Sequence, residues 1–264
     1  MTHWLPALPL LLAAGALAAG VRRLHRRGDR WPWPRTAAAA AGLALLAAGL
    51  LPPLATVHGD PRVHMVQHLL VAMAGPLLLA LGAPVTLALR AVRTPTRRRL
   101  LAFLASRPLR ALTWPPVVVA LEVGGLYLVY LGGLGEQAER VPLLHAALHV
   151  HMIAAGWLFA ELVAGSDPMP RPGVPARLGL IVVAGAAHDV LAKLLYADGG
   201  GEAAQIMYYG GTLVDVALAT AVLARWYAAG GRELARTTRR TRPATPADQG
   251  SSRDLGPGLL ADPR

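Results

Sequence analysis

The chain has no cysteine among its 264 residues, which excludes disulfides and thiolate metal ligands. Aromatic residues make up only 5% of it and charged residues only 16%. A glycine-rich phosphate loop, a nucleophile elbow and a metalloprotease signature are also lacking. We therefore predict that the protein is not an enzyme, and that any metal is held by His, Met, carboxylate or backbone oxygen.

Apolar residues dominate what is present. Hydrophobic residues form 54% of the chain, its mean hydropathy is +0.42, and its apolar runs are long enough to cross a bilayer. The run 64–89 is longer than a bilayer needs, so we expect a tilt or a bend there, with a kink at Gly75-Pro76. The pattern predicts an all-α, polytopic membrane helix bundle of seven transmembrane helices, at 4–20, 36–54, 64–89, 114–134, 143–164, 176–197 and 206–228.

Basic residues alternate between the loops. Of the 26 Lys and Arg residues, 23 lie after the first, third, fifth and seventh runs or at their edges. The opposite loops hold only Arg62 and Arg140, and Lys193 lies inside a run. By the positive-inside rule, the N-terminus is outside and the C-terminus is cytoplasmic, in a multi-pass protein of the bacterial plasma membrane. The net charge of +11 therefore reflects topology, and we expect no nucleic-acid partner.

The two ends of the chain differ in character. We predict a seven-helix transmembrane domain over 1–230 and a disordered basic cytoplasmic tail over 231–264. The tail is rich in Arg, Thr, Pro and Gly, so it cannot bury enough apolar surface to fold, and its arginines can contact anionic lipid. Because arginines follow the first run and none precedes it, we expect a retained helix rather than a signal peptide cleaved near Ala19.

Five of the histidines in or beside the later runs form a set toward the predicted outer side. Four of them form two pairs with a spacing of four, which places both rings of a pair on one helix face. At a rise of 1.5 Å per residue, all five fall within about three turns of the outer surface. Because a polar ring in hydrocarbon must be satisfied, this clustering predicts a metal site. Its predicted ligands are His64, His68, His145, His149 and His188.

Imidazole and thioether ligands suit copper, above all Cu(I), so copper is the predicted metal. Met65 and Met152 are possible further ligands, and His58 in the preceding loop can approach from above, whereas His151 points away from His149. Two imidazole pairs can also bracket a haem iron. The structural alternative is that these histidines are hydrogen-bonded packing residues and that the methionines fill apolar gaps.

Acidic residues also lie inside the predicted runs. Asp189 and Lys193 are four residues apart and predict an intrahelical ion pair, with either a structural or a proton-handling role. We expect Glu122 and Asp215 to face the bundle interior, where either can pair with an imidazole. Asp189 and Asp215 are also possible members of the metal site. Pairs of glycines in the later runs permit close approach between helices.

Several stretches, in order, resemble one family. They are His64-Met65-Val66-Gln67-His68-Leu69-Leu70 continuing to Leu81-Gly82-Ala83-Pro84, His145 to His149 leading to Gly156-Trp157-Leu158-Phe159, Asp167-Pro168-Met169-Pro170, the region of His188, and Tyr208-Tyr209-Gly210-Gly211 before Asp215. Over roughly residues 30–228 the chain resembles the CtaG family, bacterial assembly factors for caa-type cytochrome c oxidase. The resemblance implies a plasma-membrane protein needed to make active haem-copper oxidase, through copper insertion.

We therefore interpret the chain as a membrane assembly factor, a copper chaperone of the respiratory chain. It binds copper through paired histidines near the periplasmic face and delivers it to an oxidase subunit. The expected partners are haem-copper oxidase subunits, the lipid bilayer and a periplasmic copper donor. A copper transporter is the main alternative, but the cytoplasmic halves of the runs are apolar apart from Glu122 and Glu161. A haem-binding electron carrier and a structural scaffold for assembly are the others.

Overall fold

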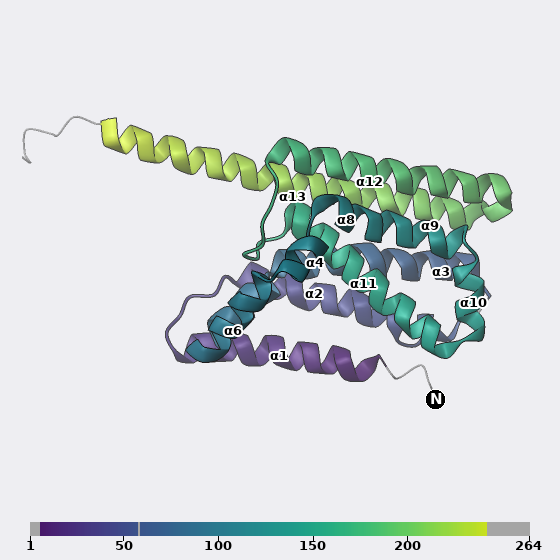
Figure 1. The fold of residues 1–264 in the computed structure, drawn as a ribbon, viewed down its shortest axis with the longest axis horizontal. Coiled ribbons are helices and arrows are strands. Elements are labelled where there is room, and N and C mark those ends of the chain that lie inside the picture. The colour runs from purple at the N-terminus through teal and green to yellow at the C-terminus, as the bar shows by residue number, and fades with distance from the viewer. Residues whose placement is uncertain (1–5, 58, 242–264) are drawn as a thin grey trace, which may run out of the picture. The chain divides into compact units, whose positions relative to one another are not determined.

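A computed structural model of the chain describes residues 6–57 and 59–241, and every regular element in this part is a helix (Figure 1). Residues up to Val222 form one compact unit, and those from Leu223 belong to a second. The α-helices are α1 (Ala7–Arg26), α2 (Trp33–Leu50), α3 (Pro61–His68), α4 (Gly75–Gly82), α5 (Pro84–Ala91), α6 (Thr94–Leu104), α7 (Arg107–Leu112), α8 (Pro115–Val119), α9 (Gly125–Tyr130), α10 (Leu134–Arg140), α11 (Pro142–Ala164), α12 (Val174–Leu195) and α13 (Gly201–Thr241). A 3₁₀ turn, η2 (Leu54–Thr56), and three π-helical turns, η3 (Leu69–Ala74), η4 (Ala120–Gly124) and η5 (Tyr196–Gly200), complete them.

The described chain is all-helical, as predicted, and five of its stretches are long and apolar enough to cross a membrane. A sixth candidate is the pair Pro115–Tyr130 and Leu134–Arg140, which is bent by 69°. The five are Ala7–Arg26, Trp33–Thr56, Pro61–Ala91, Pro142–Ala164 and Val174–Leu234.

Proline fixes the starts of most of these helices. It lies in the first turn of α2, α3, α5, α6, α7, α8, α11 and α12, where its missing N–H loses no helical hydrogen bond. Asp60 caps α3 by accepting a hydrogen bond of 2.9 Å from the Arg62 backbone N–H. The sequence itself therefore determines where these helices begin.

The first unit has two ends. At one, which we call the histidine end, Met65 packs with Leu191, Ala203 and Met207, near Tyr130. At the other, the arginine end, a second cluster joins the end of α1, the loop before α2 and the start of α5; its members are Leu24, Trp31, Ala83 and Leu87. The largest apolar cluster lies between the ends and includes Leu77, Phe159 and Leu218.

The third predicted run is interrupted twice. The π turn η3 follows His68 directly, and α4 then begins at Gly75 with Pro76 in its first turn. The second interruption is at Ala83, which has φ 55° and ψ 58° between α4 and α5. Proline at position 84 disfavours the right-handed helical region for the residue before it, which is why the helix ends there. The run is thus irregular near the predicted kink, with a π turn before Gly75 and a left-handed residue at Ala83, while Pro61–Ala91 as a whole remains one candidate span.

Helices α12 and α13 run side by side in opposite directions up to Val222 (Figure 1). Ile181 and Ala184 share a cluster with Val214 and Leu218, whereas Leu191 packs with Met207 nearer the turn. The turn lies at η5, where Asp198 and Gly199 leave helical geometry. The boundary predicted for the tail at residue 230 differs from the structure, because α13 is helical through Thr241. The rest of the predicted tail, 242–264, lies outside the described residues.

Candidate functional site

Two histidines from different helices meet inside the first unit. The rings of His68 at the end of α3 and His188 in α12 stack at an interplanar angle of 14°, with their centroids 5.9 Å apart. The two side chains are only 4% and 6% exposed. All four of their ring nitrogens are buried without a hydrogen-bond partner among the described residues. Since buried polar groups are almost always hydrogen-bonded, this pair is the strongest sign of a ligand site in the structure.

Glycines create the space for these rings. A Cβ added at Gly211 in α13 would meet the His188 ring, with Nδ1 only 2.6 Å away. Three residues before His188, a Cβ at Gly185 would lie 2.5 Å from Oδ2 of Asp215. Position 211 therefore has to stay small for the His188 ring, and position 185 for the Asp215 carboxylate. The expectation that glycine pairs permit close helix approach holds here.

Tyr130 at the end of α9 lies between the buried pair and the histidine end. Its ring makes edge contacts with His64, at 5.9 Å between centroids, and with His68, at 5.8 Å. Its hydroxyl donates to the sulfur of Met65 at 3.6 Å, so a thioether lies beside the same group. His64 is therefore one aromatic ring away from His68 rather than in contact with the pair.

A cavity extends from the buried pair toward the middle of the bundle. Its polar lining is His68, His188, Glu122 and Asp215, and it is large enough to hold a few water molecules. A second hollow on the other side of His68 and Glu122 is lined by Tyr130 and His151. Glu122 lies in the π turn η4, and His68 directly precedes η3. π turns inside α-helices are frequent at functional sites, and here two of them border one cavity.

The cavity has an apolar floor on the side of the arginine end. Leu77, Phe159, Ala160 and Leu218 line it there, and all four belong to the large apolar cluster. The polar lining is therefore confined to the part of the cavity nearer the histidine end and the middle of the bundle.

The second predicted histidine pair does not join the first. His145 and His149 in α11 have ring centroids 4.5 Å apart, and Nδ1 of His149 donates to the His145 carbonyl at 3.1 Å. His145 is exposed and His149 half-buried. Among the residues that the structure describes, no three His, Asp or Glu side chains form a group that could hold a metal ion. The five predicted ligands thus fall into a buried pair, an exposed pair and His64.

The remaining predicted candidates have separate positions. His151 hydrogen-bonds the Leu121 carbonyl at 3.2 Å, which agrees with the expectation that it points away from His149. Met152 lines the second hollow with His68. Met207 is fully buried in the cluster at the histidine end, a packing role. His58 lies outside the described residues.

The predicted ion pair between Asp189 and Lys193 is absent from the described part of the chain. The Lys193 amine lies over the Tyr208 ring instead, 5.3 Å from its centroid. Oδ1 of Asp189 is buried and has no hydrogen-bond partner in the part of the chain that the structure describes. The prediction was wrong because a spacing of four only permits contact, and the long Lys193 side chain is exposed and reaches an aromatic face on α13.

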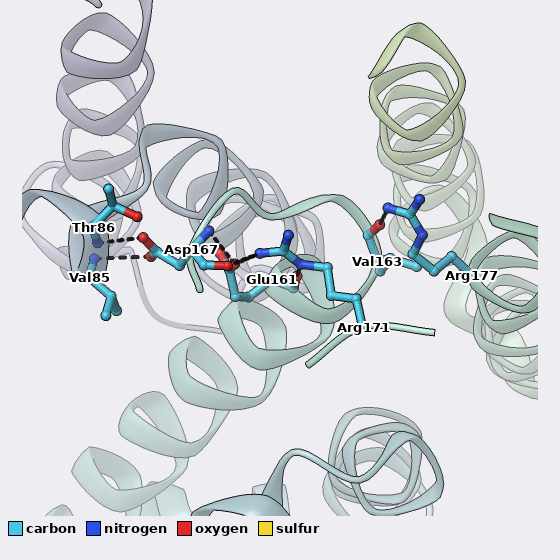
Figure 2. A network of polar contacts seen from close by, with 7 residues as sticks. All are labelled: Val85, Thr86, Glu161, Val163, Asp167, Arg171 and Arg177. Atoms are coloured by element: carbon cyan, nitrogen blue, oxygen red, sulfur yellow. Dashed lines mark hydrogen bonds and ion pairs between the residues drawn. The ribbon is translucent and has the colours of Figure 1, made fainter. Parts of the chain in front are cut away.

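A polar network at the arginine end was not expected from the sequence (Figure 2). The carboxylate of Asp167 accepts the backbone N–H groups of Val85 at 3.0 Å and Thr86 at 2.6 Å, at the start of α5. Glu161 accepts from the Asp167 backbone at 2.9 Å and pairs with Arg171 at 2.6 Å. Arg171 also donates to the carbonyl of Asp167.

This network has a structural role. Glu161 and Asp167 are 0% and 1% exposed, yet each has a charged or N–H partner. Asp167 supplies the cap that the start of α5 lacks in its own sequence, which ties the loop after α11 to the break at Ala83. The stretch Asp167-Pro168-Met169-Pro170 indicates a loop in the sequence. Only the structure shows that the Asp167 carboxylate binds the backbone at the start of α5.

Comparison with known proteins gives a family and several uncharacterised relatives. A protein of Mycobacterium bovis and one of Mycobacterium tuberculosis are each 34% identical over 189 residues, and one of Mycobacterium leprae is 33% identical over 186. Each match covers 66% of this chain but only 28% of the relative. No solved structure matches the chain. The family of cytochrome c oxidase caa3 assembly factors, Caa3_CtaG, matches residues 15–200, so this chain belongs to that family.

Proposed function

We propose that this assembly factor binds Cu(I) between His68 and His188 and transfers it to a subunit of the haem-copper oxidase. One observation carries the proposal: two buried imidazoles from separate helices lie 5.9 Å apart between ring centroids, and all four ring nitrogens lack a hydrogen-bond partner among the described residues. Neutral imidazole is a good ligand for Cu(I), which accepts low coordination numbers and also binds thioether. The sulfur of Met65 lies 3.6 Å from the hydroxyl of Tyr130, whose ring contacts His68.

The five sequence-predicted ligands then have unequal roles. His68 and His188 are the retaining ligands. His64 lies near enough to His145 and His149 to interact with them electrostatically, so these three can form an outer binding region that meets incoming copper. No enzymatic step is required, because exchange of ligands is sufficient for transfer between proteins.

Seven spans fit the helices. The stretch Val174–Leu234 contains two antiparallel helices broken at η5, and the bent pair Pro115–Tyr130 with Leu134–Arg140 adds one more to the remaining four. With an odd number of spans and most arginines in alternate loops, the histidine end faces the periplasm and the arginine end the cytoplasm. In the bacterial plasma membrane this places the copper pair within reach of a periplasmic donor.

The apolar floor of the cavity favours assembly over transport. A transporter needs a route to both faces, whereas here Leu77, Phe159 and Leu218 separate the histidines from the arginine end. Copper that enters from the histidine end therefore leaves by the same end. We therefore expect the protein to donate its copper to a partner on the periplasmic side.

The test is Cu(I) binding by detergent-purified protein, measured by competition with a chromophoric Cu(I) chelator. We expect about one tightly bound ion, and His68→Ala with His188→Ala should lower affinity at least ~10-fold. The matched control is His145→Ala with His149→Ala, which removes as many imidazoles from the exposed pair and should leave the retained ion in place. Circular dichroism melting confirms that both variants fold. Equal affinity of the His68 and His188 variant and the unmodified protein would refute the proposal.

Function in cells is tested by oxidase assembly. In cells whose own copy is deleted, the His68 and His188 variant should restore little oxidase copper content, whereas the His145 and His149 variant should restore most of it. A normal oxidase copper content in cells that carry the His68 and His188 variant would contradict the proposal and favour a structural scaffold for assembly.

A further inference from the structure

Two carboxyl groups line the cavity beneath the buried imidazoles. Glu122 reaches it from η4 and Asp215 from α13, and they are close enough to repel each other electrostatically. Neither has an ion pair or a side-chain hydrogen bond among the described residues. Both are half-buried. Unpaired carboxyl groups in the interior of a membrane protein are costly and usually mark a functional site.

Three cationic side chains in and around the later helices have other partners. Lys193 lies over the Tyr208 ring, and Arg171 and Arg177 bind Glu161 and the Val163 carbonyl at the arginine end. Although the net charge of the protein is strongly positive, no described Lys or Arg side chain forms an ion pair with Glu122 or Asp215.

An independent observation points to a ligand in the same cavity. His68 and His188 are more than nine-tenths buried and line the cavity, and their ring nitrogens have no partner within residues 6–57 and 59–241. Imidazoles supply lone pairs but no charge, so a bound Cu(I) ion would bring one uncompensated positive charge into the bundle. The carboxyl groups can supply the charge that the imidazoles lack.

We infer that Glu122 and Asp215 are the counter-charge of the bound ion and make the cavity selective for cations. This inference rests on the proposed function and adds two residues to it. The acids act through the electric field in a region of low dielectric, where charges interact strongly over several ångströms. Gly185 positions one of them, because its missing side chain lets the Asp215 carboxylate lie against α12 one turn from His188. Neither acid has to touch the ion.

The proposal predicts opposite signs for two measurements. Glu122→Gln and Asp215→Asn should each weaken Cu(I) binding about 10-fold, because each removes attraction for the ion. The same variants should raise the melting temperature of the metal-free protein, because each removes repulsion and desolvation cost. An acid with a merely structural role would show the reverse, a lower melting temperature with unchanged affinity.

The experiment compares these variants with two controls, using Cu(I) and the redox-inert probe Ag(I). Glu136→Gln removes an exposed carboxylate in α10 and should change neither quantity. Glu122→Asp keeps the charge and should retain most of the affinity.

The outcomes separate the two proposals. If the unmodified protein binds neither ion, the proposed function and this inference both fail. If it binds them and Glu122→Gln with Asp215→Asn binds them equally well, only the counter-charge is refuted.

Discussion

Replacement of Gly211 by alanine tests the buried histidine pair with a single methyl group. The added Cβ would meet the His188 ring, with Nδ1 at 2.6 Å where ordinary contact begins at 3.4 Å, so the ring must move by the difference or more. The ring borders the cavity, so it can yield to the added methyl group only by leaving its place beside His68. Two costs follow, one in stability and one in copper affinity.

The stability change has two opposing parts. Overpacking a well-packed interior typically costs ~1–3 kcal/mol. Alanine is the better helix former by ~1 kcal/mol, which offsets part of that cost. We therefore expect a net loss of roughly 0–2 kcal/mol. Copper affinity should fall further, by ~10-fold or more, because ligand positions must be held within about 0.5 Å.

The assay pairs thermal unfolding in detergent with Cu(I) competition. Gly230→Ala is the matched control, because its added Cβ would meet nothing within 4 Å, so it should gain up to ~1 kcal/mol of stability and bind copper normally. A folded Gly211→Ala protein with unaltered copper affinity would refute the argument that the His188 ring position matters.

Three further substitutions test other parts of the structure. Asp167→Asn leaves one of two backbone N–H groups of α5 without its charged acceptor, so unfolding should become easier by ~2–4 kcal/mol while the copper affinity of the folded protein is unchanged; a loss of affinity would link the two ends of the bundle. Tyr130→Phe frees the Met65 sulfur from a hydroxyl donor and should raise Cu(I) affinity ~2- to 5-fold, whereas a ~10-fold loss would make the hydroxyl itself part of the site. Hydrogen bonding from Arg62 holds the pKa of Asp60 below its usual value of 3.8, so its contribution to stability is present above that value and is lost as the pH falls through the lowered one. Asp60→Asn should therefore lower the melting temperature slightly at neutral pH and make its acid-side fall less steep, and a curve with the same acid side as the unmodified protein would contradict this.

The membrane character and the family were predictable because each depends on features spread along the chain. Long apolar runs predict spans wherever they occur, and the family motifs follow one another in order. Breaks within runs were harder to predict. Ala83 is apolar and reads as part of a continuous span, and only Pro84 after it signals the left-handed turn.

The arrangement of the histidines was less predictable. A spacing of four correctly places His145 and His149 side by side, but it says nothing about the neighbour that their helix face meets. The buried pair joins His68 to His188, which are far apart in the sequence, and the π turn after His68 adds a local change of register that periodicity cannot anticipate. Gly211 is the one signal in the sequence that, in retrospect, marks the space for the His188 ring.

The distribution of polar groups through the bundle separates holding an ion from moving it across. From the histidine end inward, the chain places His64, Tyr130, the two buried imidazoles and then the acids of the cavity. Beyond them the large apolar cluster extends to Glu161, whose charge is already satisfied by Arg171. A cation attracted into such a cavity gains nothing by moving further, because the apolar cluster that it would have to cross offers no ligand and the carboxylate beyond it is already paired with Arg171. Under the proposed function, the asymmetry that would retain copper would also return it to the end where it entered, which is what donation to a neighbouring oxidase subunit requires.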